Sequence, residues 1–301
     1  MSGISAILRE LRAPFLTVSV IPVLLAAALA HHETGGWRPV LFLLSLAGAV
    51  FLHLGANIMN DWFDHLSGND AANVDYAAPF TGGSRMIQKG LLTPRTVLAM
   101  ALGFFAAASA VGVIIAFEAG WPVIAFGLAG LFLGIAYTAP GVMLAARGLG
   151  EVAIFLAFGL ITAGAYYVQT GTVTFHCVVA SLPPAMMTTA IILINEFQDS
   201  AADAATGKDT LVVRLGRRRA VPVFAAILLG AYLPVLAGVL SGMMPPWTFI
   251  STATLPIALR ATGTAFRSFD SPGALSAANA ATIICHFLTG ALLVAGYLIP
   301  A

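Results

Sequence analysis

The chain has 301 residues, a formal net charge of +1 and a mean hydropathy of +0.93, and 59% of its residues are hydrophobic. Only 9% are charged, against roughly 25% in a typical soluble protein. So few charges cannot cover the surface of a soluble fold of this length, and a net charge of +1 gives no reason to expect a nucleic-acid partner. The composition predicts an all-α polytopic membrane protein that contacts membrane lipid.

Nine apolar segments have about the length, ~20 residues, that a helix needs to cross a bilayer. In chain order they are 14–31, 39–59, 96–117, 121–138, 150–168, 176–195, 220–241, 246–260 and 277–299. Thr93 and Pro94 precede the third segment as an N-cap and a first-turn proline. The first segment resembles a signal peptide, but Glu10 and the many later spans favour an uncleaved first helix.

The basic residues predict how these spans are oriented. With the N-terminus in the cytoplasm, thirteen of the fourteen Lys and Arg residues fall on the cytoplasmic side and only Arg38 falls outside. Two long cytoplasmic loops, about 57–95 and 195–219, hold eight of the thirteen acidic residues: Asp61, Asp64, Asp70, Asp75, Glu196, Asp199, Asp203 and Asp209. This concentration predicts an active site that faces the cytoplasm.

The two loops carry related motifs. The first reads NIMNDWFDHLSGND from Asn57, and the second reads NEFQDSAADAATGKD from Asn195. Five residues match in order, at an offset of 138 or 139 positions: Asn57 with Asn195, Asp61 with Asp199, Asp64 with Asp203, Gly68 with Gly207, and Asp70 with Asp209. The matches predict one domain, 1–301, built from a duplicated four-helix unit at about 38–168 and 176–299.

The spacing of the aspartates predicts metal chemistry. Residues three or four positions apart share a helix face, and stacked carboxylates repel unless a cation lies among them. Mg²⁺ binds carboxylate oxygens while keeping waters and substrate phosphates. The predicted ligands are Asp61, Asp64, Asp199 and Asp203, with Asp70 and Asp209 as further candidates. The alternative, that these acids are ordinary polar caps on solvated helix ends, fits a single motif better than a duplicated pair.

Polar and basic residues near the acids are candidates for binding a diphosphate. The segment from Thr81 to Lys89 contains two glycines and ends in cations, so it can offer N–H groups and a guanidinium to phosphate oxygens. The candidate set is Asn57, Arg85, Lys89, Tyr137, Arg147, Asn195 and Lys208. Tyr137 can also be an interfacial belt residue, and Arg147 a determinant of orientation.

Four other residues are expected to be structural. His53, one turn before Asn57, is expected to be a buried and satisfied histidine rather than a ligand. Glu151 is expected to be a carboxylate in the first turn of a helix, where it is favourable, rather than an active-site acid. Cys177 and Cys285 lie in apolar stretches without metal-ligand spacing, which indicates small core side chains.

The motifs resemble those of the UbiA-type superfamily of intramembrane aromatic prenyltransferases. The similar segments are LRAPFLTVSVIPVLL, NDWFDHLSGND, TGGSRMIQKGLLT, YTAPGVMLAARGLGE and NEFQDSAADAATGKDTLVVRLG. The spacing of Asp64, Gly68 and Asp70 is most similar to the 1,4-dihydroxy-2-naphthoate polyprenyltransferases of menaquinone synthesis. Glu196 and Gln198 depart from the pattern, since many members of that branch have Asn and Arg there.

The resemblance implies a nine-helix fold and a Mg²⁺-dependent enzyme, with a bacterial inner membrane as its location. The implied reaction transfers a polyprenyl group from its diphosphate to 1,4-dihydroxy-2-naphthoate, with decarboxylation, giving demethylmenaquinone. Asp61, Asp64, Asp199 and Asp203 would act through Mg²⁺ as the catalytic aspartates. The residues that would bind the diphosphate oxygens are Arg85, Lys89 and Lys208.

Three alternatives stay open. The enzyme could use another aromatic or lipid acceptor, or it could cyclise a terpene without an acceptor. A more distant alternative is a divalent-cation carrier or secondary transporter. Transporter sites generally lie near the bilayer midplane at broken helices, whereas these acids are predicted at the cytoplasmic helix ends.

Overall fold

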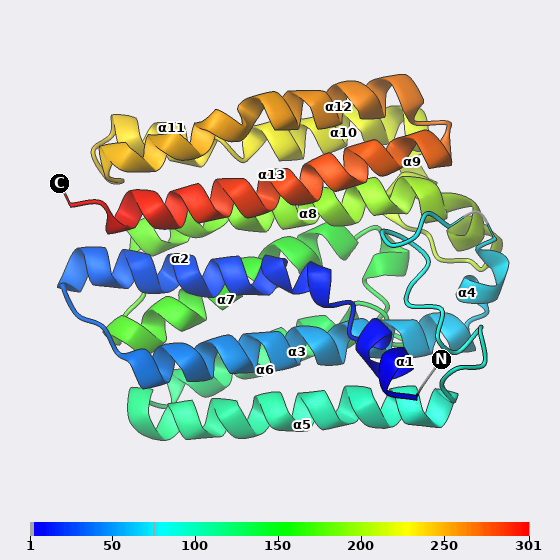
Figure 1. Ribbon diagram of the computed structural model, residues 1–301, viewed down its shortest axis with the longest axis horizontal. Coiled ribbons are helices and arrows are strands. Elements are labelled where there is room, and N and C mark those ends of the chain that lie inside the picture. The colour runs from blue at the N-terminus through cyan, green and yellow to red at the C-terminus, as the bar shows by residue number, and fades with distance from the viewer. Residues whose placement is uncertain (1–2, 75, 301) are drawn as a thin grey trace.

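The computed structural model describes residues 3–74 and 76–300, so the candidate acid Asp75 lies outside the described residues. Long helices run roughly along the longest axis of the molecule (Figure 1), and no strand occurs in the two described ranges. The fold is therefore all-α, as predicted.

The elements follow one another with short connections, apart from the long segment between α4 and α5. In the first half they are α1 (Gly3–Glu10), η1 (Ala13–Leu16), α2 (Thr17–Thr34), α3 (Pro39–Leu66), α4 (Asn69–Ala72), α5 (Pro94–Ala119), α6 (Pro122–Ala136), η2 (Ala145–Arg147) and α7 (Gly150–Thr170). In the second half they are α8 (Phe175–Ala205), α9 (Leu211–Leu215), α10 (Arg217–Gly230), α11 (Leu233–Leu240), η3 (Pro246–Thr254), α12 (Leu255–Ser268) and α13 (Pro272–Leu298).

Local sequence explains where several helices begin. The Thr93 side chain accepts a hydrogen bond from the Thr96 N–H and Pro94 occupies the first turn of α5, so the predicted N-cap is confirmed. Thr174 caps α8 in the same way, by accepting from the Cys177 N–H at 3.1 Å. Pro234 stands at the start of α11 and interrupts the predicted segment 220–241, which becomes the two helices α10 and α11.

The chain is an integral membrane protein. Within the described ranges, seven helical segments are long and apolar enough to cross a bilayer, with α10 and α11 counted as one segment. The predicted span 121–138 is the shorter helix α6, and the predicted span 246–260 is 3₁₀-helical through Thr254 before α12 begins. Large apolar side chains such as Phe117, Phe132 and Leu240 are exposed, as expected of a lipid-facing surface. The count of nine spans and the cytoplasmic N-terminus stay predictions.

The helices α3 and α8 are longer than the predicted spans because both continue through their aspartate motifs. Helix α3 carries Asp61 and Asp64, and α8 carries Asp199 and Asp203. The short helix α4, which begins within the first motif, and α9, which follows the second, lie at the same end of the bundle, whereas α13 ends at the opposite end (Figure 1). The two motifs are therefore brought to one end of the molecule.

Candidate functional site

A cavity of about 500 Å³ runs into the bundle from the motif end, between α2, α3, α5, α6, α7 and α8. Its polar end is lined by residues of both motifs: Asn57, Asn60, Asp64, Asn69, Asp70, Asn73, Asn195, Asp199, Asp203 and Lys208. Deeper in the bundle the walls are mostly apolar and include Leu52, Phe126, Leu131, Phe158 and Ile161. The cavity therefore combines a charged entrance with a hydrocarbon-like interior.

Lys208 joins the two motifs at the polar end. Its Nζ donates to both Asp64 carboxylate oxygens, at 3.1 and 3.3 Å, and lies 3.9 Å from Asp203 Oδ1. Burial lowers the pKa of the Lys208 ammonium, but Asp64, Asp203 and Asp199 outweigh this effect and raise the pKa above its ordinary value. The structure thus brings together three predicted site residues: Asp64 of α3, and Asp203 and Lys208 of the second motif.

Three asparagines hold the carboxylates in place, and the sequence analysis missed them. Asn69 donates to Asp203 Oδ1 at 2.9 Å, and Asn73 donates to Asp199 Oδ1 at 2.6 Å, so α4 and its C-cap reach across to the second motif. Asn60 donates to Asp64 Oδ2 at 2.9 Å. The spacing of four between residues 60 and 64 could have indicated that contact, whereas the cross-motif bonds depend on tertiary structure.

Asp61 lies behind the loop that contains Gly82 and Gly83, and it does not line the cavity. The residue is only 4% exposed, its Oδ2 accepts from the Ser84 N–H at 2.8 Å, and its Oδ1 lies 4.0 Å from the Arg12 guanidinium. Asp61 Oδ1 has no hydrogen-bond partner among the described residues. Gly83 adopts φ +66°, and a Cβ there would lie 2.8 Å from Asp61 Oδ1, so this position favours glycine for two reasons.

The four aspartates predicted as metal ligands do not converge on one point. In the described part of the chain, no three His, Cys, Asp or Glu side chains are arranged to hold one metal ion. Asp64, Asp199 and Asp203 share the cavity, while Asp61 is set apart. Their joint role in binding Mg²⁺ stays a prediction.

The two further metal candidates differ in their surroundings. Asp70 lines the cavity, accepts from Gln88 Nε2 at 2.8 Å and lies 3.9 Å from Arg85 Nη1. Burial, with smaller effects of Asp61 and Asp64, raises the pKa of Asp70 to about 8. The Asp209 side chain is 58% exposed beside Arg214, away from the cavity, so the structure does not bring it to the site.

Three of the basic candidates for diphosphate binding lie outside the cavity lining. Arg85, with φ +64°, donates to the backbone carbonyls of Asp70 and Asn73 and stacks 4.0 Å over the Tyr76 ring. These contacts indicate that Arg85 braces the loop between α4 and α5. Lys89 and Arg147 are exposed, and Arg147 Nη2 donates to the Gly141 carbonyl at 2.7 Å. Of the predicted cations, only Lys208 lines the cavity.

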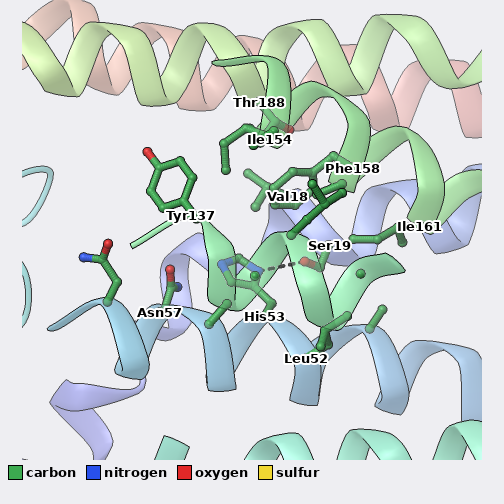
Figure 2. A pocket seen from close by; sticks show the side chains of 18 of the residues that line it. Val18, Ser19, Leu52, His53, Asn57, Tyr137, Ile154, Phe158, Ile161 and Thr188 are labelled. Atoms are coloured by element: carbon green, nitrogen blue, oxygen red, sulfur yellow. Dashed lines mark hydrogen bonds between the residues drawn. The ribbon is translucent and has the colours of Figure 1, made fainter. Parts of the chain in front are cut away.

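The other predicted residues do face the cavity. Asn57 and Tyr137 both line it, from α3 and from the C-cap of α6 (Figure 2). Asn195 also lines the cavity, and its Oδ1 accepts from Asn279 Nδ2 of α13 at 2.7 Å. Arg12 is a cavity residue that the sequence analysis counted only as a cytoplasmic charge.

The residues expected to be structural divide into two groups. Cys177 and Cys285 are free and buried, and Glu151 lies in the first turn of α7, as predicted. His53, by contrast, lines the cavity instead of being enclosed in the core (Figure 2). Its Nδ1 lies 2.7 Å from the Ser19 hydroxyl, so it is a satisfied histidine as predicted, but its place on the cavity was not expected.

Comparison with known proteins identifies the family. The model of the UbiA prenyltransferase family matches residues 19–288. The chain belongs to the UbiA prenyltransferase family. It is thus a membrane-embedded enzyme that transfers prenyl groups, as the resemblance implied.

Curated relatives and a solved structure agree with this family. The chain is 28% identical over 293 residues to the 2-carboxy-1,4-naphthoquinone phytyltransferase of Synechocystis sp., covering 96% of this chain and 92% of the relative. It is 31% identical over 244 residues to the 1,4-dihydroxy-2-naphthoate octaprenyltransferase of Mycobacterium tuberculosis, covering 79% and 77%. A UbiA homologue from Archaeoglobus fulgidus bound to DMAPP and Mg²⁺ shares the fold, with a TM-score of 0.68, 14% identity and coverage of 95% and 98%.

Proposed function

We propose that this prenyltransferase transfers a polyprenyl group from polyprenyl diphosphate to 1,4-dihydroxy-2-naphthoate. The observation that carries the proposal is a cavity in which Lys208 links the carboxylates of both motifs at one end and apolar side chains line the interior. Relatives named for transfer to 1,4-dihydroxy-2-naphthoate or 2-carboxy-1,4-naphthoquinone support a naphthalene-type acceptor with a carboxylate.

The residues at the polar end fit a Mg²⁺ ion. Their donors are hard oxygens, and Mg²⁺ needs only one or two protein carboxylates when waters and phosphates complete its shell. Asp64, Asp199 and Asp203 line the same end of the cavity, and Asp61 Oδ1 is a further buried oxygen without a hydrogen-bond partner in the described ranges. The Mg²⁺ in the A. fulgidus homologue supports the same cofactor here. When bound, Mg²⁺ neutralises the diphosphate and stabilises the charge that develops on it as a leaving group.

The side chains of this end hold the reactants. The Lys208 ammonium can exchange a carboxylate partner for a diphosphate oxygen, because it already lies among several acceptors. Asn60, Asn69 and Asn73 keep the carboxylates oriented through their amide groups.

The apolar interior suits the isoprenoid chain. Burying hydrocarbon contributes ~0.8 kcal/mol per CH₂, so a polyprenyl tail gains affinity along walls such as Leu131 and Ile161. The same walls exclude water, which would otherwise capture the allylic cation. In the reaction, the bond between the prenyl carbon and the diphosphate oxygen breaks, and a carbon–carbon bond forms at the ring carbon that carries the carboxylate. The carboxylate then leaves as carbon dioxide.

The location follows from the same features. The motif end carries most of the basic residues, so by the positive-inside rule we place it on the cytoplasmic side of a bacterial inner membrane. Water-soluble diphosphate would then leave to the cytoplasm, while the prenylated product stays in the lipid.

The test is an assay of purified protein in detergent with a polyprenyl diphosphate and 1,4-dihydroxy-2-naphthoate, with and without Mg²⁺, followed by mass spectrometry. We expect a decarboxylated prenyl naphthoquinol that forms only with Mg²⁺. Release of diphosphate without a naphthoate adduct would redirect the proposal to another acceptor or to terpene cyclisation. Protein that neither binds nor consumes the diphosphate would contradict the proposal and favour a transporter.

A further inference from the structure

A hydrogen-bonded pair of polar side chains, Ser19 of α2 and His53 of α3, lies within the apolar part of the cavity. The Ser19 hydroxyl and His53 Nδ1 are 2.7 Å apart, and both residues line the cavity. The His53 ring meets Phe158 edge-on, with the centroids 5.9 Å apart and an interplanar angle of 85°. The ring is thus held in one orientation from two sides.

The position of the pair points to a polar ligand. Figure 2 shows His53 between Ser19 on one side and Asn57 and Tyr137 on the other, with Leu52 and Phe158 close by. His53 precedes Asn57 by one helical turn, which places it about 6 Å deeper along the helix axis at 1.5 Å per residue. A prenyl tail offers only hydrocarbon, so it cannot satisfy an imidazole nitrogen that faces the cavity. A hydroxylated aromatic ring can.

We propose, on the basis of the proposed function, that His53 is a catalytic residue that accepts the proton of the aromatic acceptor's hydroxyl through Nε2. Ser19 is a positioning residue. In the tautomer that this role requires, its hydroxyl oxygen accepts the Nδ1–H, and the lone pair on Nε2 is left for the acceptor. Ser19 is itself fully buried, so its hydroxyl stays beside Nδ1.

The proton step balances with the transfer. As the ring carbon bonds to the prenyl cation, the neighbouring hydroxyl becomes a carbonyl and its proton passes to His53 Nε2. The resulting β-keto carboxylate loses carbon dioxide, and the electron pair of the broken carbon–carbon bond forms an enolate. The enolate oxygen takes the proton back from the imidazolium, so His53 is neutral again and no other acid or base is consumed.

The apolar surroundings suit this role. A hydroxyl on a ring that has just bonded a carbocation is strongly acidic, so an imidazole takes its proton. The charge is transient, because decarboxylation follows.

The first test compares the substitutions His53→Ala and His53→Gln with a control, His31→Ala. The control removes an exposed histidine in the last turn of α2, at the other end of that helix from Ser19. We expect transfer by both His53 variants to fall by about a hundredfold to ten-thousandfold, the usual contribution of a general base. Mg²⁺-dependent binding of polyprenyl diphosphate should stay within about twofold of the wild type, since the polar end is unchanged. The His31 variant should transfer at the wild-type rate.

The second test separates chemistry from structure. Added imidazole should restore transfer to His53→Ala in a saturable manner, because the small base fits the space that the side chain vacates. It should leave His53→Gln and the wild type unchanged. Ser19→Ala should lower kcat by about tenfold with an unchanged KM for the diphosphate, because only the orientation of the base is lost.

Three results would overturn the inference. Transfer within twofold of the wild type in both His53 variants would exclude a role in the reaction. Loss of diphosphate binding together with transfer, without rescue by imidazole, would assign His53 a purely structural role. A wild-type enzyme that binds the diphosphate but prenylates no hydroxynaphthoate would overturn the proposed function as well, and that result is recognised before any variant is made.

Discussion

Polar networks occupy both ends of the bundle, and they differ in whether their side chains line the cavity. At the motif end, Lys208 and three asparagines contact carboxylates that line the cavity. At the opposite end, Glu33 accepts from the Tyr166 hydroxyl and lies 2.7 Å from His176 Nδ1, and His176 Nε2 lies 2.8 Å from the Tyr297 hydroxyl. None of these four residues lines the cavity.

This difference shows how a binding site can be distinguished from a purely structural hydrogen-bond network in a membrane protein. Both networks contain a carboxylate and a cationic or potentially cationic partner. The network around Glu33 is closed, because each polar group is matched by another residue of the chain, and it joins α2, α7, α8 and α13. The network around Lys208 has carboxylate oxygens on a cavity, which a ligand can reach. Contact with the cavity, rather than polarity alone, identifies the site.

The largest effect is expected for Asp64→Asn. This change removes one of the charges that face the cavity, and we expect turnover to fall by about 10³-fold, comparable with the loss of one strong electrostatic contact in a preorganised site. The control is Asp270→Asn, which changes an exposed aspartate after α12. Wild-type turnover by the purified and folded Asp64 variant would remove the motif end from the mechanism.

Lys208→Met tests the link between the motifs. A hydrogen bond to a charged group contributes about 1.5–3 kcal/mol, so the KM for polyprenyl diphosphate should rise by about 10- to 100-fold. The site becomes more negative, and the concentration of Mg²⁺ that gives half-maximal activity should therefore fall. Lys208→Arg, which keeps the charge, should retain more of the affinity. An unchanged KM in the methionine variant would contradict the assignment of Lys208 to the diphosphate.

Gly83→Ala tests whether activity depends on the position of the Asp61 carboxylate beside Gly83. The added Cβ would lie 2.8 Å from Asp61 Oδ1, whereas at Gly90, with nearly the same positive φ, a Cβ meets nothing within 4 Å. Both alanine variants bear a backbone strain of about 1–2 kcal/mol, so their difference isolates the contact. We expect kcat to fall by about tenfold in Gly83→Ala and to be unchanged in Gly90→Ala, since a carboxylate displaced by a fraction of an ångström still retains most of its field. Equal kinetics in the two variants would show that Asp61 is not held through this contact.

The smallest effect on activity is expected for Glu33→Gln, at the closed network. Loss of the carboxylate should lower the free energy of unfolding by about 1–3 kcal/mol, because two hydrogen-bond partners lose a charged acceptor. Thermal unfolding in detergent should show the loss, while kcat and KM stay within twofold of the wild type. Glu118→Gln, an exposed control, should change neither. A fall in kcat of Glu33→Gln without a loss of stability would mean that the two ends of the bundle are coupled.

Much of this could be predicted from the sequence, because the signals were local. Hydropathy located the seven helical segments that are long and apolar enough to span a bilayer, and the Thr93–Pro94 pair located the start of α5. The duplicated motifs brought Asp64, Asp203 and Lys208 to attention, and the structure brings these residues together. Helical continuity through both motifs followed from the spacing of the aspartates.

What could not be predicted depends on how loops fold over the helix ends. Arg85 looks like a phosphate ligand when it follows two glycines, yet its guanidinium is engaged by the carbonyls of residues 70 and 73. Asn69 and Asn73 look like ordinary loop residues until α8 is placed beside them. No sequence pattern marks His53 as a cavity residue. The position of α2 decides whether the face of α3 that carries His53 lies against the core or the cavity.

The hydrogen bonds that join the first half of the chain to the second have a consequence for biosynthesis. Asn69 and Asn73 belong to the first half of the chain, and their partners Asp203 and Asp199 belong to the second. A nascent chain that ends at the loop before α8 therefore has amides without carboxylates, and no lysine for Asp64. On the proposed function, we expect no activity before residue 208 has been synthesised, and therefore no reactive allylic cation in a half-synthesised chain. Two fragments divided at 171–173 should be inactive alone and regain activity when they are produced together.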